Sequence, residues 1–368
     1  MRFDYSQEQL MLIDSIRRTL QDLPATSVKA NGSAGVVQPG TNEVASALAS
    51  VGLFSMMLPE EDGGLGLGLV DGVAAAIETG RAAVPFPAIE CMAGSLLIGK
   101  LHPDSVPQFT EGKLAITAPV HGGLEAKDGN HPAISGEVSI PFPAMAKLMV
   151  SSVSLGEGPA RSILSEFDEN AVEETDGIDL CYPVGKMHFS RQFSDNEIVP
   201  ERIDMVLSVL ASAELLGAAE HCLEKSVNYL KEREQFGKVI GTFQSLKHIA
   251  ADCQVRLDAM RASVEYAAAI YDRFKAGGED APTLEEVENY VHIAKAYCSE
   301  AAQKIARECI QLHGGIAFTW EYGLHVHFRR ISRLAFSAGT PNEHFEPLAG
   351  IAIDRAANYG GLGADPIL

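Results

Sequence analysis

Apolar positions recur at helical spacing in the first third of the chain. Ser6-x-x-Gln9 has the form of a capping box, in which each side chain bonds the backbone of the other residue. The apolar residues that follow share one helical face: Leu10, Leu12, Ile13, Ile16 and Leu20. Two further helices are predicted over residues 45–53 and 70–80, with a Gly-rich connection over 58–68 between them. We expect a helical N-terminal domain over residues 1–111.

The pattern changes between residues 112 and 200. Short β-prone runs separated by Gly, Pro and acidic clusters replace the helical spacing; they cover 114–117, 138–140, 148–153 and 178–181. Such runs are typical of a small all-β unit. The sequence therefore predicts a middle β-barrel-like domain, 112–200, which is short.

Helical periods return from residue 201 onward. One apolar stripe follows i, i+3, i+4, i+7 spacing: Leu246, Ile249, Cys253, Leu257, Met260 and Val264. Thr283-x-x-Glu286 has the form of a second capping box, and it precedes another long apolar stripe that reaches Cys309. These stripes predict a four-helix-bundle-like domain over residues 201–368. The expected fold class is mainly α with a small β domain.

Composition narrows the kinds of partner. The chain has 368 residues, 46% of them hydrophobic, and a formal net charge of -20. That charge argues against nucleic acid as a partner because it repels phosphate backbones. The six cysteines form no CxxC pair, so we expect buried, reduced thiols. The N-terminus shows no signal-peptide or transit pattern, and we see no apolar run long enough for a membrane span. We therefore expect a cytoplasmic protein without a membrane partner.

Three stretches of the chain resemble the acyl-CoA dehydrogenase family. They are GLF and LPEEDGGLGLG within 52–68, followed by ETGR at 78–81; REQFGKVIGTFQ at 233–244; and QLHGGIAFTWEY at 311–322. Their order, spread over nearly the whole chain, makes the resemblance specific. Helices, then a β unit, then a helical bundle is also the family's architecture.

The resemblance implies FAD as the cofactor, held at a subunit interface by residues from two chains. The positions that match the family's bundle half of the flavin site are Arg233, Phe236, Gln244, Gln311, Gly314 and Gly315. A guanidinium pairs with pyrophosphate oxygens, and glycines let backbone N–H groups approach an anion. The simpler alternatives are a surface ion pair at Arg233 and a helix C-cap at Gly314.

The sheet half of the family's flavin site is poorly matched. Residues 116–123 read ITAPVHGG, without the Glu and Ser-Asp of the family's E-P-x-x-G-S-D segment. Residues 138–143 read VSIPFP where the family has a W-[IV]-[TS] strand, and Trp320 is the only tryptophan of the chain. The chain is thus expected to supply the bundle half alone.

The family's catalytic base is also missing. Ala338 and Leu207 occupy the two places where family members carry the glutamate, and neither side chain can accept a proton. We therefore assign no catalytic residue to this chain. A base relocated to Asp204 or Glu214 stays open, although solvated or inter-helix carboxylates are the simpler explanation for both. Glu343 is interpreted as a helix-face charge.

Two other motifs are interpreted as structural. The glycines of 63–68 have neither a strand before them nor a helix with a ribose-binding acid after them, so a dinucleotide-binding loop is not expected. His313, His325, His327 and His344 lack a converging carboxylate or cysteine, and we predict no metal site.

Our leading hypothesis is a subunit of a heteromeric, flavin-dependent acyl-CoA dehydrogenase. By resemblance to the split dehydrogenases of bacterial steroid side-chain degradation, the partner would be a homologous catalytic chain in an α2β2 assembly. The substrate would be a bulky acyl-CoA, and an electron-transfer flavoprotein-like acceptor would reoxidise the flavin. Two alternatives remain: a self-sufficient homo-oligomeric dehydrogenase, or a non-catalytic acyl-CoA-binding or assembly protein.

Overall fold

The computed structural model describes residues 5–23, 27–29, 35–37, 41–127, 132–156, 158–320 and 322–358. Helices make up the N-terminal part: α1 (Gln7–Asp22), α2 (Thr41–Ser50), α3 (Leu69–Arg81), α4 (Ala88–Leu101) and α5 (Val106–Thr110). A short pair of strands, β1 (Ser27–Lys29) and β2 (Gly35–Val37), lies between α1 and α2 in the sequence. The capping box at Ser6 and Gln9 is confirmed. Helix α2 ends earlier than expected because a turn begins after Ser50, in which Gly52 has φ +75°.

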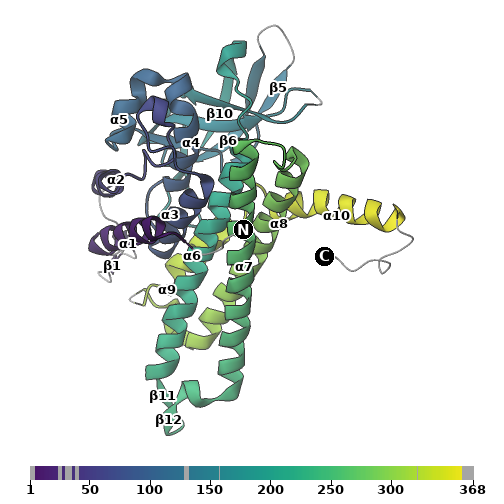
Figure 1. Cartoon of the computed structure of the whole chain (residues 1–368). Coiled ribbons are helices and arrows are strands. Elements are labelled where there is room, and N and C mark those ends of the chain that lie inside the picture. The colour runs from purple at the N-terminus through teal and green to yellow at the C-terminus, as the bar shows by residue number, and fades with distance from the viewer. Residues whose placement is uncertain are drawn as a thin grey trace.

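The middle of the chain folds into two small sheets, which lie above the bundle in Figure 1. One sheet contains β3 (Ala115–Thr117), β7 (Ala146–Val153) and β8 (Arg161–Glu166). The other contains β4 (His121–Gly122), β5 (Glu125–Lys127), β6 (Ala133–Pro141), β9 (Glu173–Thr175) and β10 (Val184–Gln192). Side chains from both sheets share one apolar cluster, including Ile140, Met149, Ile163 and Phe189.

The strand predicted over residues 178–181 is wrong, because this segment is a turn. The Asp179 carboxylate accepts a hydrogen bond from the Cys181 backbone N–H at 3.1 Å, which closes the turn. The same carboxylate pairs with the buried guanidinium of Arg330. The buried ion pair between Asp179 and Arg330 thus decides the conformation of this segment, in spite of its local β propensity.

The C-terminal part is a bundle of long helices: α6 (Ile203–Glu232), α7 (Gln244–Ala276), α8 (Leu284–His313), α9 (Leu324–Leu334) and α10 (Pro341–Asn358). The hairpin of β11 (Glu234–Gln235) and β12 (Lys238–Val239) joins α6 to α7 at the free tip of the bundle (Figure 1). Helix α10 projects sideways from the bundle (Figure 1). The expected fold class, mainly α with a small β unit, is confirmed.

Helix α6 crosses α3 at a distance that only glycine permits. A Cβ built at Gly217 would lie 1.9 Å from the Ile77 carbonyl oxygen, and one at Gly80 would lie 2.2 Å from the Glu214 carbonyl oxygen. Both are far inside van der Waals contact, so the two backbones touch. This contact joins the N-terminal helices to the bundle.

Helix α6 also corrects our expectation about apolar runs. By length and composition alone, Ile203–Glu232 could cross a membrane. Within the fold, however, 83% of its apolar window is buried. Its apolar surface is buried by packing against α3, α7, α8 and α9.

The six cysteines are all buried and free, as the sequence predicted. Burial raises the pKa of the Cys91 thiol and of the five others. Such thiols are inert, because the thiolate is the reactive form.

Candidate functional site

The tip of the bundle carries three of the predicted flavin-binding residues. Arg233 ends α6, Phe236 lies in the hairpin turn, and Gln244 begins α7. Phe236 and Gly237 have φ of +54° and +77° between paired residues Gln235 and Lys238, as a two-residue type I′ turn requires. This turn directs the Phe236 ring outward, where it is 91% exposed.

The other three lie where α8 ends. Gln311 is exposed on the last turn of α8, and Gly314 follows as its C-cap with φ +64°. A Cβ built at Gly314 or at Gly315 would meet nothing within 4 Å. The backbone there is open to an approaching group.

Within the described ranges, the side chains of Arg233, Gln244 and Gln311 are exposed and make no ion pair or hydrogen bond. The surface ion pair considered for Arg233 is therefore absent from the described residues. The helix C-cap considered for Gly314 is present, and it leaves the same backbone accessible. The side-chain polar groups of Arg233, Gln244 and Gln311 are therefore free to bind an anion and a nucleoside.

A cleft of about 610 Å³ lies where the β unit meets the bundle. Its walls include both Leu207 and Ala338, together with Gly122 and Gly123 of the segment that should have carried the sheet half of the flavin site. The two expected base positions therefore face one space, although 131 residues of sequence separate them (338 minus 207). Neither offers a proton acceptor.

The turn that carries Ala338 is held from several sides. Ala338 has φ +53°, in the left-handed region. Its carbonyl oxygen accepts a hydrogen bond from Nε2 of His344 at 2.9 Å. Below the turn, the fully buried Lys295 donates to the carbonyl oxygens of Leu334, Ala335 and Gly339 at 3.2–3.3 Å. Burial lowers the pKa of Lys295 to about 7.

His344 also fixes the protonation of a second histidine in the cleft. Because Nε2 of His344 donates to a carbonyl, Nδ1 of the neutral ring is an acceptor. Nδ1 of His292 lies 2.9 Å from it and must be the donor. Burial lowers the pKa of His344 to about 4 and also lowers that of His292, so both rings are neutral at pH 7. Sequence analysis missed this pair, because no local spacing connects the two positions.

Asp204 lines the cleft, but both of its oxygens are occupied. They accept hydrogen bonds from Nε and Nη2 of Arg202 at 2.9 and 2.6 Å. Arg202 also pairs with Glu288 at 2.5 Å. Glu343 lines the same cleft, and its Oε2 accepts from the Thr340 backbone N–H at 2.7 Å, which caps α10.

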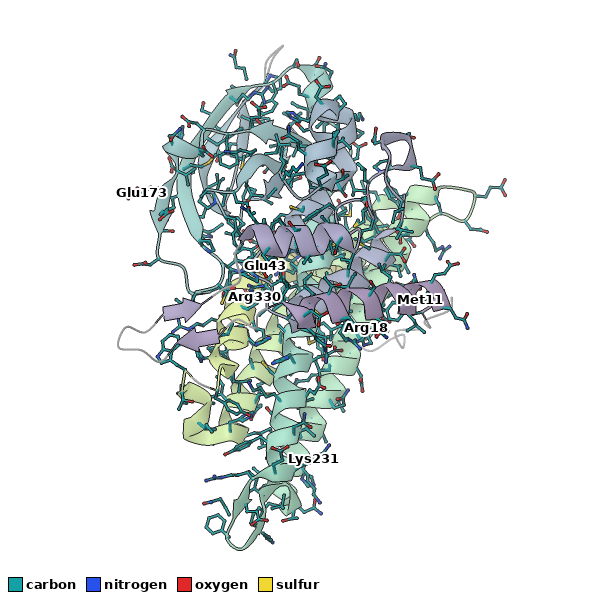
Figure 2. The ribbon with its side chains drawn as sticks, turned by 90° about the vertical axis from the view of Figure 1, so that its left-hand side faces the viewer. Met11, Arg18, Glu43, Glu173, Lys231 and Arg330 are labelled. Atoms are coloured by element: carbon teal, nitrogen blue, oxygen red, sulfur yellow. The ribbon has the colours of Figure 1, made fainter. Side chains whose placement is uncertain are left out.

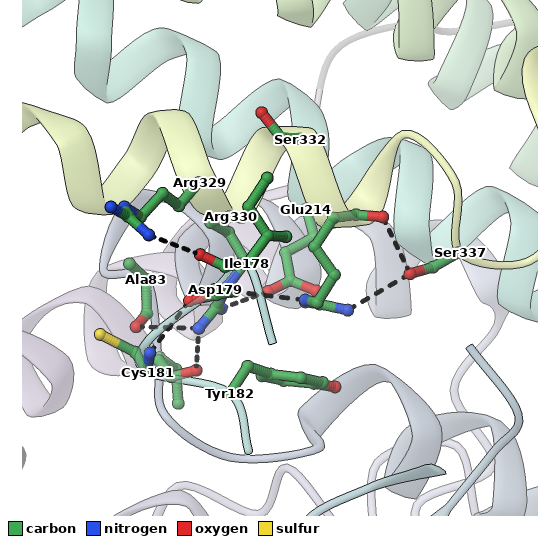
Figure 3. A network of polar contacts seen from close by, with 12 residues as sticks. Ala83, Ile178, Asp179, Cys181, Tyr182, Glu214, Arg329, Arg330, Ser332 and Ser337 are labelled. Atoms are coloured by element: carbon green, nitrogen blue, oxygen red, sulfur yellow. Dashed lines mark hydrogen bonds and ion pairs between the residues drawn. The ribbon is translucent and has the colours of Figure 1, made fainter. Parts of the chain in front are cut away.

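Glu214 lies away from the cleft in a buried charge network (Figure 3). Its Oε1 accepts from Nη1 of Arg330 at 2.8 Å, while Nε of Arg330 bonds Asp179. Arg330 is fully buried and also donates to the backbone carbonyl of Val84 at 3.0 Å. Figure 2 places Arg330 in the middle of the molecule, far from Lys231 near the tip. The inter-helix interpretation of Glu214 therefore fits the structure.

The network continues through Arg333 to a buried acid. The Arg333 guanidinium lies 3.6 Å from the ring centroid of Tyr182, whose hydroxyl donates to Glu90 at 2.6 Å. Burial raises the pKa of Glu90 to about 7. No sequence motif predicts these partners of Arg330 and Arg333, because they come from segments distant in the chain.

Histidines and acids do not converge on a metal in the part of the chain that the structure describes. No group of three His, Cys, Asp or Glu side chains there is arranged to hold one.

Comparison with known proteins places this chain in a family. Residues 6–102 match the acyl-CoA dehydrogenase N-terminal domain, and residues 207–349 match the acyl-CoA dehydrogenase C-terminal domain. The acyl-CoA dehydrogenase IpdE2 of Mycobacterium tuberculosis is 31% identical over 297 residues, which cover 80% of this chain and 81% of the relative. The chain therefore belongs to the acyl-CoA dehydrogenase family, and the expected cofactor, FAD, follows from that membership.

Two further likenesses concern related proteins. The acyl-CoA dehydrogenase FadE34 of Mycobacterium tuberculosis is 29% identical over 290 residues, which cover 78% of this chain but 39% of the relative. A solved structure of a variant of the Tcur3481-Tcur3483 steroid ACAD has a TM-score of 0.77 and 24% identity, and the match covers 95% of this chain and 99% of that one. The second likeness shows the shared fold.

Proposed function

We propose that this chain is the non-catalytic subunit of a heteromeric acyl-CoA dehydrogenase and supplies half of a flavin site to a related catalytic chain. One observation carries the proposal. Both positions of the family's base face one cleft as Leu207 and Ala338, while the bundle's flavin-binding positions are exposed and unpaired.

The residues at the bundle tip fit the dinucleotide half of FAD. Arg233 would pair with the pyrophosphate, whose oxygens suit a guanidinium. Gln244 and Gln311 would bond the adenosine. The missing side chains at Gly314 and Gly315 would leave room for the anion beside this backbone, where the Gly314 N–H itself bonds the end of α8. When bound there, FAD would supply the hydride acceptor for this family's α,β-dehydrogenation of acyl-CoA thioesters.

Proton removal would then fall to the partner. Of the two carboxylates considered as a relocated base, Asp204 lines the cleft, and both of its oxygens accept hydrogen bonds from Arg202. Glu214 is tied to Arg330 in the core. Neither is free to take a proton from the α-carbon of a thioester.

The relatives support a two-chain assembly and a bulky substrate. One solved structure of this fold is of a variant of the Tcur3481-Tcur3483 steroid ACAD, and another is of the ChsE4-ChsE5 complex from Mycobacterium tuberculosis. In the cleft of this chain, neither Leu207 nor Ala338 can act as the base that a complete site would need. We propose an α2β2 complex with a homologous catalytic subunit, a steroid side-chain or other bulky acyl-CoA as substrate, and an electron-transfer flavoprotein-like acceptor. We also propose a cytoplasmic location.

Purification tests the proposal directly. We expect the chain alone to be colourless and inactive, and co-expression with a related chain that carries the glutamate to give yellow, active protein. In that complex Arg233→Ala should strip the flavin. Arg307→Ala is the matched control, because Arg307 is exposed on α8 and bonds only Gln303 among the described residues.

Two results would overturn it. A homo-oligomer of this chain that holds FAD and oxidises an acyl-CoA would establish the self-sufficient alternative, and a loss of turnover in Asp204→Asn with flavin retained would locate its base. A chain that stays colourless with every related partner would favour the non-catalytic binding or assembly protein.

A further inference from the structure

A second cavity, of about 940 Å³, lies beside the middle of α6 and shares no lining residue with the cleft. His221, Lys225 and Asn228 line it from one face of α6. Trp320 and Tyr322 line it from the segment before α9. We call it the Lys225 cavity. The resemblance to the family assigns it no role.

Lys225 brings an unneutralised positive charge to this cavity. Its Nζ donates to the Tyr322 carbonyl oxygen at 2.5 Å and lies 4.4 Å from the centroid of the Tyr322 ring. No carboxylate among the described residues pairs with it, whereas Glu78 and Glu224, which line the same cavity, pair with Arg17 and Arg81 respectively. A half-buried ammonium without a counter-charge favours binding of an anion.

His327 adds a buried acceptor without a donor. Nε2 of His327 donates to the Arg81 carbonyl oxygen at 2.9 Å, so Nδ1 of the neutral ring carries a lone pair. This Nδ1 is buried and has no partner within the described residues. The side chain lines the cavity and its residue is only 8% exposed. A ligand with an N–H or O–H group would satisfy it.

Aromatic rings form one part of the wall. His221 stacks on His327 with ring centroids 4.0 Å apart and an angle of 9° between the planes. Trp320 meets the ring of His325 edge-on at 4.6 Å. The rings of His221 and Trp320 give the cavity π surfaces that a planar ring can contact.

We propose that the Lys225 cavity binds a planar aromatic anion of about mononucleotide size, with its anionic group at Lys225 and a hydrogen-bond donor of the ligand toward His327. A nucleoside monophosphate and an aromatic carboxylate share this chemistry. The site is separate from the flavin half-site at Arg233 and does not depend on the proposed function.

Trp320 provides the readout, because it is the only tryptophan in the chain and lines the cavity. We expect adenosine 5′-monophosphate or 2-naphthoate to change its fluorescence saturably at up to millimolar concentration. Inorganic phosphate lacks the planar ring and adenosine lacks the anionic group, so each should bind at least about tenfold more weakly. Titration calorimetry on the same samples detects binding that leaves the fluorescence unchanged. Saturation by only one of the two ring-bearing anions would show whether the cavity takes a nucleotide phosphate or an aromatic carboxylate.

Variants separate this cavity from the flavin half-site. Lys225→Met should weaken binding about tenfold or more, and so should Asn228→Leu, whose exposed amide has no partner among the described residues to lose. Lys186→Met, on the exposed face of β10, is the matched control. Arg233→Ala should leave binding of adenosine 5′-monophosphate intact, although the same nucleotide is a fragment of FAD.

Three results would overturn the proposal. The first is that neither ring-bearing anion gives a saturable signal or a heat of binding. The second is that Arg233→Ala abolishes binding while Lys225→Met preserves it, which would place the nucleotide at the flavin half-site. The third is that inorganic phosphate binds as tightly as the ring-bearing anions.

Discussion

The imidazole of His344 holds the carbonyl of Ala338 in a left-handed turn, through the hydrogen bond from Nε2 at 2.9 Å. The fit between the two residues is close, since a Cβ at the neighbouring Gly339 would lie 2.4 Å from Nε2 of His344. The chain thus has a strained turn at the position where the resemblance predicts the family's base.

Ala338→Gly should stabilise the protein. A left-handed conformation costs a non-glycine residue roughly 1–2 kcal/mol, of which the greater entropy of unfolded glycine cancels part. We expect a net gain of about 0.5–1 kcal/mol in the free energy of unfolding, measured by urea denaturation. Ala335→Gly is the control in the same turn: Ala335 has φ -59°, so glycine should destabilise there. A loss of stability in both variants would contradict the prediction.

His344 should make stability fall in mild acid. Its pKa is lowered to about 4 in the folded protein from an ordinary 6.5, so between these values the unfolded chain binds a proton that the folded chain does not. The contribution of His344 to the free energy of unfolding is therefore present above about pH 6.5 and is lost as the pH falls toward 4. His344→Asn should be less stable than the wild type at pH 7, and the difference should shrink by up to about 2 kcal/mol at pH 5. A difference that stays constant across this range would refute it.

Arg330→Met should be among the most damaging core substitutions. It would leave Glu214 buried without its cation and Asp179 with Arg333 as its remaining cation, and breaking a buried pair in this way costs about 3–5 kcal/mol. Thermal unfolding measures the effect. Arg329→Met is the neighbouring control, because Arg329 is only partly buried and bonds one backbone carbonyl, at Ile178. Similar losses for the two variants would argue against the network.

Glu90 should have the opposite pH dependence to His344. Its pKa is raised from 4.5 to about 7 in the fold, mainly by burial, so the folded protein holds a proton that the unfolded chain has lost. This contribution is complete below about pH 4.5 and is lost as the pH rises through 7. Glu90→Gln keeps a neutral side chain at every pH, and we expect its stability to fall less than that of the wild type between pH 5 and pH 8. Parallel curves for the two proteins would exclude the proposed protonation.

Local patterns in the sequence foretold much of the fold. The capping boxes at Ser6 and Thr283 form as expected, because each needs only residues three positions apart. The stripe through Leu257 and Met260 is buried in the bundle. The segment 178–181 misled the prediction, since its conformation depends on Arg330, about 150 residues further along the chain.

In the candidate site, too, local motifs could be recognised in the sequence, whereas contacts between distant segments could not. Leu207 and Ala338, selected from motif positions, both line one cleft; that they occupy the family's base positions stays a prediction. The pairing of His292 with His344 and the cavity at Lys225 could not be predicted. Each brings together side chains from elements distant in sequence, and no spacing rule for a single helix or strand specifies such a meeting.

The ring of Phe236, at the apex of a tight hairpin and 91% exposed, has a consequence for how the protein is made. An exposed aromatic side chain can pack against an apolar surface of another molecule and so contribute to self-association. If a companion polypeptide covers this ring, balanced synthesis of the two products protects the cell from self-association of this one. Overproduction of this chain by itself should then yield self-associated protein beside the soluble monomer, in a fraction that Phe236→Ser would reduce.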